Sequence, residues 1–179
     1  MKINKTFNEY KNSINLILSK ISENQLNQII KIIKNTIKNS GKIYIVGNGG
    51  SASIASHVSV DFAKVARIPS STFNNSNLIT CFANDYGYDN WVTEAIKAYM
   101  NKKNDMLILI SSSGNSKNIV NAAKYCKKKS IKTVTLSGFK NNNPLSKLGN
   151  VNLHINSNQY NFIEMSHHII LVYLVDIFA

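Results

Sequence analysis

The stretch that decides the fold is Ile43-Tyr-Ile-Val-Gly-Asn-Gly-Gly-Ser51, and residues 52–66 after it have a helix-like pattern. Four apolar residues of high β propensity run into three glycines, which predicts a buried strand that ends in a loop with a closely approached backbone. Ser51 can cap the helix that follows. Unpaired N–H groups and the positive end of a helix dipole gather at such a loop, so it suits an anion or a polyhydroxylated ligand. A plain strand-to-helix turn remains the alternative, since the spacing fits neither the dinucleotide fingerprint nor the Walker motif.

A second stretch of the same kind lies further along the chain. A short apolar strand at 106–110 runs into Ser111-Ser-Ser-Gly-Asn-Ser116, and a helical pattern covers 117–129. Hydroxyls, a glycine and a new helix N-terminus make a donor-rich cradle that suits a phosphate monoester better than a cation. A helix cap alone would need only one serine. Two strand–loop–helix units predict an open, mainly parallel α/β sheet with ligands at the carboxyl ends of its strands.

The composition favours one domain and argues against nucleic acid as the partner. The 179 residues contain no Pro/Gly/Ser-rich linker, so we expect a single domain over 1–179. The net charge of +12 comes mostly from lysines scattered along the chain. Nucleic acid is the weakest partner hypothesis, because no basic stripe with interleaved aromatic residues is present. Such a surface would still attract anionic sugar phosphates.

The sequence also predicts a soluble, cytoplasmic protein with no membrane partner. Cys81 and Cys126 are far apart and lack metal-ligand spacing, so we expect reduced, packed thiols. The N-terminus lacks the apolar core of a signal peptide, and no apolar run reaches 18 residues. The apolar run at 169–179 is short enough for a buried helix.

Two helices are predicted before the first strand, over 3–21 and from about 23 to 37. The apolar face of the first helix has no evident partner in a monomer, so we expect the pair over 1–39 to pack on another subunit. The remaining expected elements are a strand near 72–73, a helical turn at 78–83, a loop at 84–87, a helix at 90–100, strands at 133–136 and 151–155, a turn at 141–144 and a last helix at 161–178.

With these motifs in place, the chain resembles the sugar isomerase (SIS) domain family, and within it the phosphoheptose (sedoheptulose 7-phosphate) isomerases. The shared features, in the family's order, are Gly47-Asn-Gly-Gly-Ser51, His57, Asn84-Asp-Tyr-Gly87, Ser113-Gly-Asn-Ser116 and the leading helical pair. The resemblance implies a flavodoxin-like three-layer sandwich with helices on both faces of the sheet. It also implies a homotetramer whose active sites lie between subunits.

The resemblance further implies which residues contact a phosphorylated sugar. The phosphate would be held by the serines of the second loop, and the sugar would lie along the first loop. The implied substrate-binding residues are Asn48, Gly49, Gly50, Ser51, Asn84, Asp85, Ser111, Ser112, Ser113 and Ser116.

The implied catalytic residues are Asp61, Glu164 and His167, and the implied zinc ligands are His57, Asp61, Glu164 and His167. No nucleotide cofactor is implied. Some family members place a zinc-binding His and a catalytic Glu at i and i+4, which share a helix face. Here the second of these is Asp61, whose side chain is shorter by about 1.5 Å. A packed or capping role for His57 is the alternative.

The last helix also departs from the family pattern. The family has a second histidine five residues after the position of His167, and that position holds Val172 here. Valine can neither carry a proton nor bind a metal. His168 lies about 100° around the helix from His167, so we do not expect it to replace the missing residue.

Two functions follow from the resemblance. The first is an aldose–ketose isomerase of a phosphorylated sugar, with sedoheptulose 7-phosphate converted to a heptose 7-phosphate for surface polysaccharide. The second is a phosphosugar-binding or regulatory protein that kept the phosphate cradle and lost the chemistry, like the replication-initiation-associating proteins of the same family.

Overall fold

The computed structural model describes residues 6–100 and 103–179, and its centre is a five-stranded sheet. The order is β2-β1-β3-β4-β5, and every neighbouring pair is parallel. The strands are β1 (Ile43–Gly47), β2 (Ser70–Thr72), β3 (Met106–Ile110), β4 (Lys132–Ser137) and β5 (Val151–His154). The predicted open parallel sheet is therefore confirmed.

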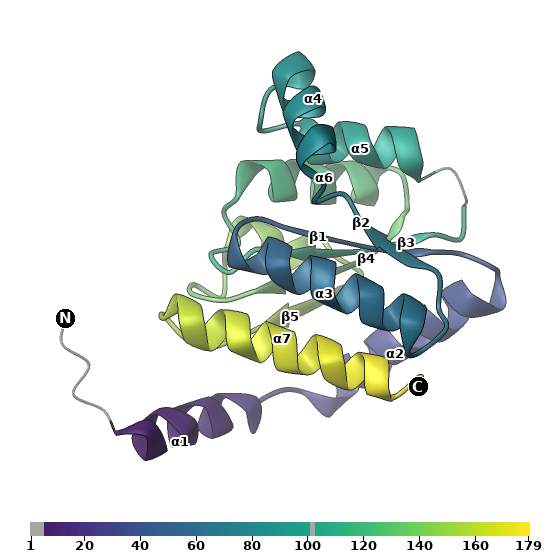
Figure 1. The fold of residues 1–179 in the computed structure, drawn as a ribbon. Helices are drawn as coiled ribbons and strands as arrows, with labels where there is room; N and C mark the ends of the chain where they lie inside the picture. Colours follow the sequence, from purple (N-terminus) through teal and green to yellow (C-terminus); the bar gives the residue numbers. More distant parts are fainter. Residues whose placement is uncertain (1–5, 101–102) are drawn as a thin grey trace.

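Helices cover both faces of this sheet (Figure 1). One layer holds α4 (Ser76–Tyr86), α5 (Trp91–Tyr99) and α6 (Lys117–Lys128), and the other holds α2 (Glu23–Lys38), α3 (Gly50–Lys64) and α7 (Tyr160–Asp176). Along β1, Ile43 and Ile45 belong to one apolar core, whereas Tyr44 and Val46 belong to the other. Burial on both faces explains the unbroken apolar strand sequence, and it makes the molecule a three-layer sandwich.

The predicted helical pair is present as α1 (Phe7–Leu18) and α2. Residues 3–5 of the first predicted helix lie outside the described part of the chain. Every described residue of α1 is exposed or only partly buried, and Phe7 is 82% exposed. The ring of Tyr10 contacts Phe162 of α7 at 4.8 Å between centroids, which places α1 along α7. Within the described residues, no helix is both long and apolar enough to cross a membrane.

The predicted loop at 84–87 is wrong, because residues 84–86 form the last turn of α4. Asn75 caps the start of this helix by accepting from the N–H of Asn77. Gly87 ends it with a φ of 78°, a left-handed conformation that glycine adopts without a steric penalty. The polar residues before Gly87 are the solvent side of an amphipathic helix rather than a loop.

The role predicted for Ser51 as a helix cap is also wrong. The helix α3 begins at Gly50, and its N-cap residue is Gly49 with a φ of 55°. Because Gly49 can make this sharp turn, Ser51 falls inside the helix, where it is buried and its Oγ lies 3.5 Å from Ser112 Oγ. The turn 141–144 leads into a short 3₁₀ helix, η1 (Pro144–Lys147).

Candidate active site

The two loops predicted to bind a ligand lie side by side at one edge of the sheet. Strands β1 and β3 are neighbours, and Gly47 pairs with Ile110 at their carboxyl ends. The loops that follow enclose a cavity of about 240 Å³. Its lining residues are Asn48, Gly49, Gly50, Ser51, Ile110, Ser111, Ser112, Ser113, Ser116, Tyr160 and Glu164. Tertiary structure thus brings both motifs and the last helix to one site.

The serine loop, residues 111–116, is a tight turn that leads into the start of α6. Gly114 has a φ of 66°, and its N–H donates to the carbonyl oxygen of Ser111. The Ser111 hydroxyl donates to Ser116 Oγ at 3.1 Å. Ser116 is the N-cap residue of α6, and its side chain makes this contact within the loop instead of a hydrogen bond to the helix backbone. The N–H groups of the first turn of α6 therefore remain suited to an anion.

The glycine loop, residues 47–51, is hydrogen-bonded to α6 through a pair of asparagines. The side-chain amides of Asn48 and Asn118 exchange two hydrogen bonds of 2.9 Å each. Tyr88 donates its hydroxyl to Asn48 Oδ1 at 3.3 Å. Asn118 is buried, and its only sequence signal is its place just after the serine loop. Sequence reasoning missed Asn118 and Tyr88, because their partner lies some 40 to 70 positions away in the chain.

The carboxylate of Glu164 enters the cavity from α7. A Cβ added to Gly50 would collide with that carboxylate, so a larger residue here would displace the Glu164 side chain from its present position. Ser112 donates its hydroxyl to Glu164 Oε1 at 3.4 Å. A carboxylate that lines a cavity of serine hydroxyls and backbone N–H groups can move a proton beside a bound anion.

A histidine pair lies further along the seam between α3 and α7. His57 Nδ1 is 2.7 Å from His168 Nε2, and His57 Nε2 is 3.0 Å from Asp61 Oδ2. Burial and the nearby His57 lower the pKa of His168, and Asp61 opposes this shift. Sequence reasoning discarded His168 because it compared His168 only with His167. The usable signal was the spacing of four that places Glu164, His168 and Val172 on one helix face.

Comparison with known proteins identifies the family. The sequence model of the SIS domain matches residues 9–138. The chain belongs to the SIS domain family. It is 37% identical over 142 residues to a phosphoheptose isomerase of Helicobacter pylori strain P12, covering 76% of this chain and 73% of that protein. It is 33% identical over 169 residues to a phosphoheptose isomerase of Aliarcobacter butzleri, covering 91% and 88%.

Solved structures support the same SIS fold. A phosphoheptose isomerase from Francisella tularensis superposes with a TM-score of 0.86 at 24% identity, covering 99% of this chain and 98% of that one. The phosphoheptose isomerase of Neisseria gonorrhoeae gives a TM-score of 0.85 at 24% identity, covering 93% and 91%.

Some residues implied by the SIS resemblance lie outside the cavity. His167 is fully buried, and its Nε2 lies 3.3 Å from the carbonyl oxygen of Ser137. Burial lowers the pKa of His167 to about 4, so this imidazole is neutral at pH 7. Asn84 and Asp85 are exposed on α4, where Asn84 donates to Asp85. Neither of them lines the cavity of its own chain.

The implied zinc ligands do not form one site in the SIS domain. Within residues 6–100 and 103–179, no three His, Cys, Asp or Glu side chains are grouped so that they could hold a metal together. His57 and Asp61 are in contact, but Glu164 lines the cavity and His167 faces the end of β4. The set of four therefore does not fit a shared zinc ion.

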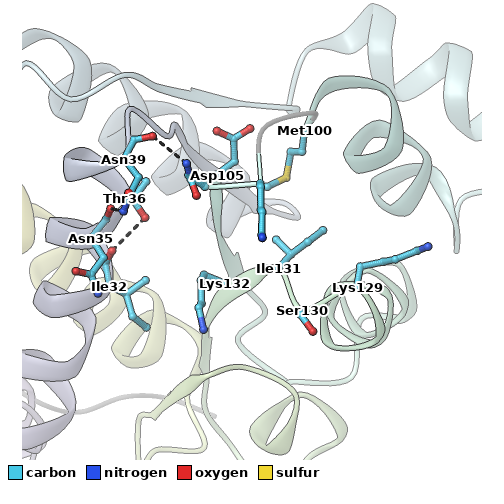
Figure 2. A pocket seen from close by; sticks show the side chains of 12 residues that line it. Ile32, Asn35, Thr36, Asn39, Met100, Asp105, Lys129, Ser130, Ile131 and Lys132 are labelled. Carbon is cyan, nitrogen blue, oxygen red and sulfur yellow. Dashed lines mark hydrogen bonds between the residues drawn. The ribbon is translucent and has the colours of Figure 1, made fainter.

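Figure 2 shows a larger cavity, of about 550 Å³, lined by residues 103–105 and 129–132, the carboxyl end of α2 and Met100. Asp105 lies there beside the start of β3, and its Oδ1 accepts the N–H of Lys42. None of the residues implied by the resemblance lines this cavity. Parallel α/β sheets bind ligands at the carboxyl ends of their strands, so the smaller cavity is the candidate active site.

Proposed function

We propose that this protein is a phosphoheptose isomerase, which converts sedoheptulose 7-phosphate to a heptose 7-phosphate for surface polysaccharide. One observation carries the proposal: two ligand-binding loops and the Glu164 carboxylate meet in a single cavity. The relatives named phosphoheptose isomerase support it, because the similarity to them covers most of both chains.

The serine loop binds the phosphate in this proposal. Ser111, Ser112, Ser113 and Ser116 line the cavity at the N-terminus of α6. Hydroxyl groups and helix N–H groups donate to phosphate oxygens, and the helix dipole favours the negative charge. The sugar then extends toward Asn48, Gly49, Gly50 and Ser51 of the glycine loop.

Glu164 moves the carbon-bound proton. An aldose–ketose interconversion transfers one proton between C1 and C2 through an enediol, and it needs a base for carbon and an acid for the oxygens. Glu164 is the carboxylate that lines the cavity. Asp61 is the candidate for the second acid or base, and its partner His57 holds it at 3.0 Å. His167 acts from the core as a positioning residue that holds α7 against the end of β4.

The active form is a cytoplasmic homotetramer built through residues 1–39 and α7. Three residues of α7 and the residue that follows the helix face away from the core and are each 40 to 46% exposed: Met165, Ile169, Tyr173 and Ile177. Their spacing of four forms an apolar stripe along the helix that α1 contacts through Tyr10, and such a stripe is suited to a second subunit.

The test is turnover of sedoheptulose 7-phosphate, followed by separation of the aldose phosphate. Glu164→Gln should abolish turnover and leave the affinity for the sugar phosphate nearly unchanged, because the amide keeps the shape but cannot accept the proton. Glu94→Gln, on α5, is the matched control and should retain full activity. Tight binding without any wild-type turnover would contradict the isomerase and leave a binding protein.

A further inference from the structure

Among the described residues that line the candidate cavity, one is aromatic: Tyr160, which begins α7. The other lining residues carry hydroxyl, amide, carboxylate or aliphatic groups, or are glycines. Tyr160 is 56% exposed, so most of its ring area is not used for packing within the chain. A large aromatic ring with a free side next to a polar cavity is suited to ligand binding, because a complex would remove that apolar area from water.

Phe139 supports the ring of Tyr160 from the loop after β4. The two ring centroids are 4.8 Å apart and the ring planes meet at 60°, an edge-to-face arrangement that aromatic pairs prefer. Phe139 is partly buried against the same apolar core as α7, and its N–H donates to the carbonyl oxygen of Ser157 at 2.9 Å. Its φ of 54° is uncommon for a residue with a side chain and persists because these contacts hold the backbone. The ring of Tyr160 therefore has a fixed neighbour.

Tyr160 and Glu164 share one face of α7. A spacing of four residues places their side chains on neighbouring turns, about 6 Å apart along the helix axis. Both residues line the cavity, and Glu164 is partly buried whereas Tyr160 is exposed. The carboxylate therefore lies deeper in the cavity, and the aromatic ring lies nearer to its mouth.

We propose that Tyr160 binds the sugar chain of the substrate, with the face of its ring packed on the carbon-bound hydrogens and the chain held over the Glu164 carboxylate. This role rests on the proposed function and adds a substrate contact to it. In that function the serine loop holds the phosphate end of the sugar. A second contact away from the phosphate restricts the positions of the reacting carbons, and a restricted geometry favours proton transfer.

The ring of Tyr160 makes the site selective for the chain that is attached to the phosphate. Inorganic phosphate fills only the serine loop, whereas a sugar chain that extends toward the mouth of the cavity meets the ring. Tyr160 therefore contributes to the affinity for sedoheptulose 7-phosphate and not to the affinity for inorganic phosphate. Because the ring and not the hydroxyl makes the contact, phenylalanine at this position keeps the contribution.

The experiment measures two affinities of the full chain and its variants: that for sedoheptulose 7-phosphate, by calorimetric titration, and that for inorganic phosphate, by competition. Tyr160→Ala should weaken the binding of the sugar phosphate by about 10-fold, because part of an aromatic side chain no longer becomes buried. Its affinity for inorganic phosphate should not change. Tyr160→Phe should bind both ligands like the wild type.

Phe139 acts through Tyr160 and is a positioning residue. Phe139→Leu keeps an apolar side chain in the core but removes the ring edge that faces Tyr160. It should weaken the binding of the sugar phosphate in the wild-type background and have no further effect in Tyr160→Ala, because two residues that act through one contact are not additive. An additive loss would overturn this part of the proposal.

The matched control is Tyr99→Ala. Tyr99 lies at the end of α5, is 50% exposed and packs on Phe73 at 5.9 Å between ring centroids, but it does not line the cavity. Both affinities of this variant should equal those of the wild type. Equal losses in Tyr99→Ala and Tyr160→Ala would overturn the proposal, since they would come from the removal of any half-exposed tyrosine.

Three further results would overturn the proposal: wild-type affinity of Tyr160→Ala for the sugar phosphate, an equal loss for inorganic phosphate, or the same loss in Tyr160→Phe. Circular dichroism checks that each variant is folded, and Tyr160→Leu replaces Tyr160→Ala if the latter is not.

Turnover separates this proposal from the proposed function. A wild type that binds sedoheptulose 7-phosphate without turnover contradicts the isomerase, and the affinities still decide the role of Tyr160. Wild-type turnover together with wild-type affinity in Tyr160→Ala contradicts only the role of Tyr160. A wild type that does not bind the sugar phosphate overturns both.

Discussion

At the scale of single residues, the candidate site depends on close polar contacts between segments that are distant in sequence. Gly50 and Glu164 illustrate this, because the carboxylate occupies the space in which any other residue would place a Cβ. The close packing at position 50 is thus a consequence of α7, not of the loop alone. The serines act differently, since their hydroxyls are already grouped by the local turn.

Ser113 offers the most direct test of phosphate binding. Ser113→Ala should weaken the binding of a sugar phosphate by about 10- to 150-fold, because a hydrogen bond to a charged group contributes about 1.5 to 3 kcal/mol. The weak binding of the unphosphorylated sugar should hardly change. Calorimetric titration with both ligands measures the difference, and equal losses would contradict the assignment of the phosphate to this loop.

His167 should make stability depend on pH. Burial lowers the pKa of His167 to about 4 in the folded protein, whereas an unfolded histidine titrates near pH 6.5. Between these values the unfolded state binds more protons, so stability is fully present above about pH 6.5 and falls as the pH drops toward 4. The loss amounts to about 3 kcal/mol.

Urea unfolding at several pH values measures this dependence. His167→Gln removes the titrating group and should flatten the curve between pH 4.5 and 6.5, whatever its effect on stability at pH 7. Identical slopes for the wild type and the variant would show that His167 is not buried in its neutral form.

At the scale of elements, the segment between β4 and η1 supports the serine loop. Asn143 donates through Nδ2 to Ser137 Oγ and to the carbonyl oxygens of Gly138 and Lys140. Its Oδ1 accepts the N–H groups at the start of η1. The same side chain lies against Gly114, where a Cβ would collide with it. The predicted plain turn is therefore a buried support of the phosphate site.

Asn143→Ala should destabilise the protein by at least about 2 kcal/mol, because it removes a helix cap and leaves buried polar groups without partners. The neighbouring Asn142→Ala is the matched control, since Asn142 is exposed and should change stability by less than about 0.5 kcal/mol. Urea denaturation compares the two variants. Equal stability would mean that the Asn143 contacts are not maintained in solution.

At the scale of the whole molecule, the apolar stripe of α7 and the exposed side of α1 remain without a partner in one chain. The two apolar cores on either side of the sheet are complete without them. Apolar residues that stay exposed although both cores are already buried favour self-association of the chain.

Light scattering should therefore give a multiple of the 20.0 kDa chain mass, with four copies expected. Ile169→Lys places a charge in the centre of the stripe and should shift the protein toward smaller species, because a buried charge in an interface is costly. Lys124→Glu on α6 changes the charge on the other side of the sheet and should leave the mass unchanged. A wild-type mass near 20 kDa would exclude the assembly.

The sequence alone determined the features that depend on neighbouring residues. Apolar runs that end in glycine or serine predicted β1, β3 and the loops after them, because β propensity and turn chemistry act over a few residues. The strands β4 and β5 and most helices followed from the same local patterns. Motif order and spacing also led to the SIS family.

Only the tertiary structure decided which distant side chains meet. Asn118 beside Asn48, Glu164 against Gly50 and His168 facing His57 are separated by 70 to 114 positions in the chain. Their contacts follow from how α6 and α7 pack on the sheet, and no local pattern encodes that packing. The position of His167 in the core was likewise decided by the tertiary structure. The apolar residues that α7 presents to the sheet set the rotation of the helix about its axis, and this rotation points His167 inward.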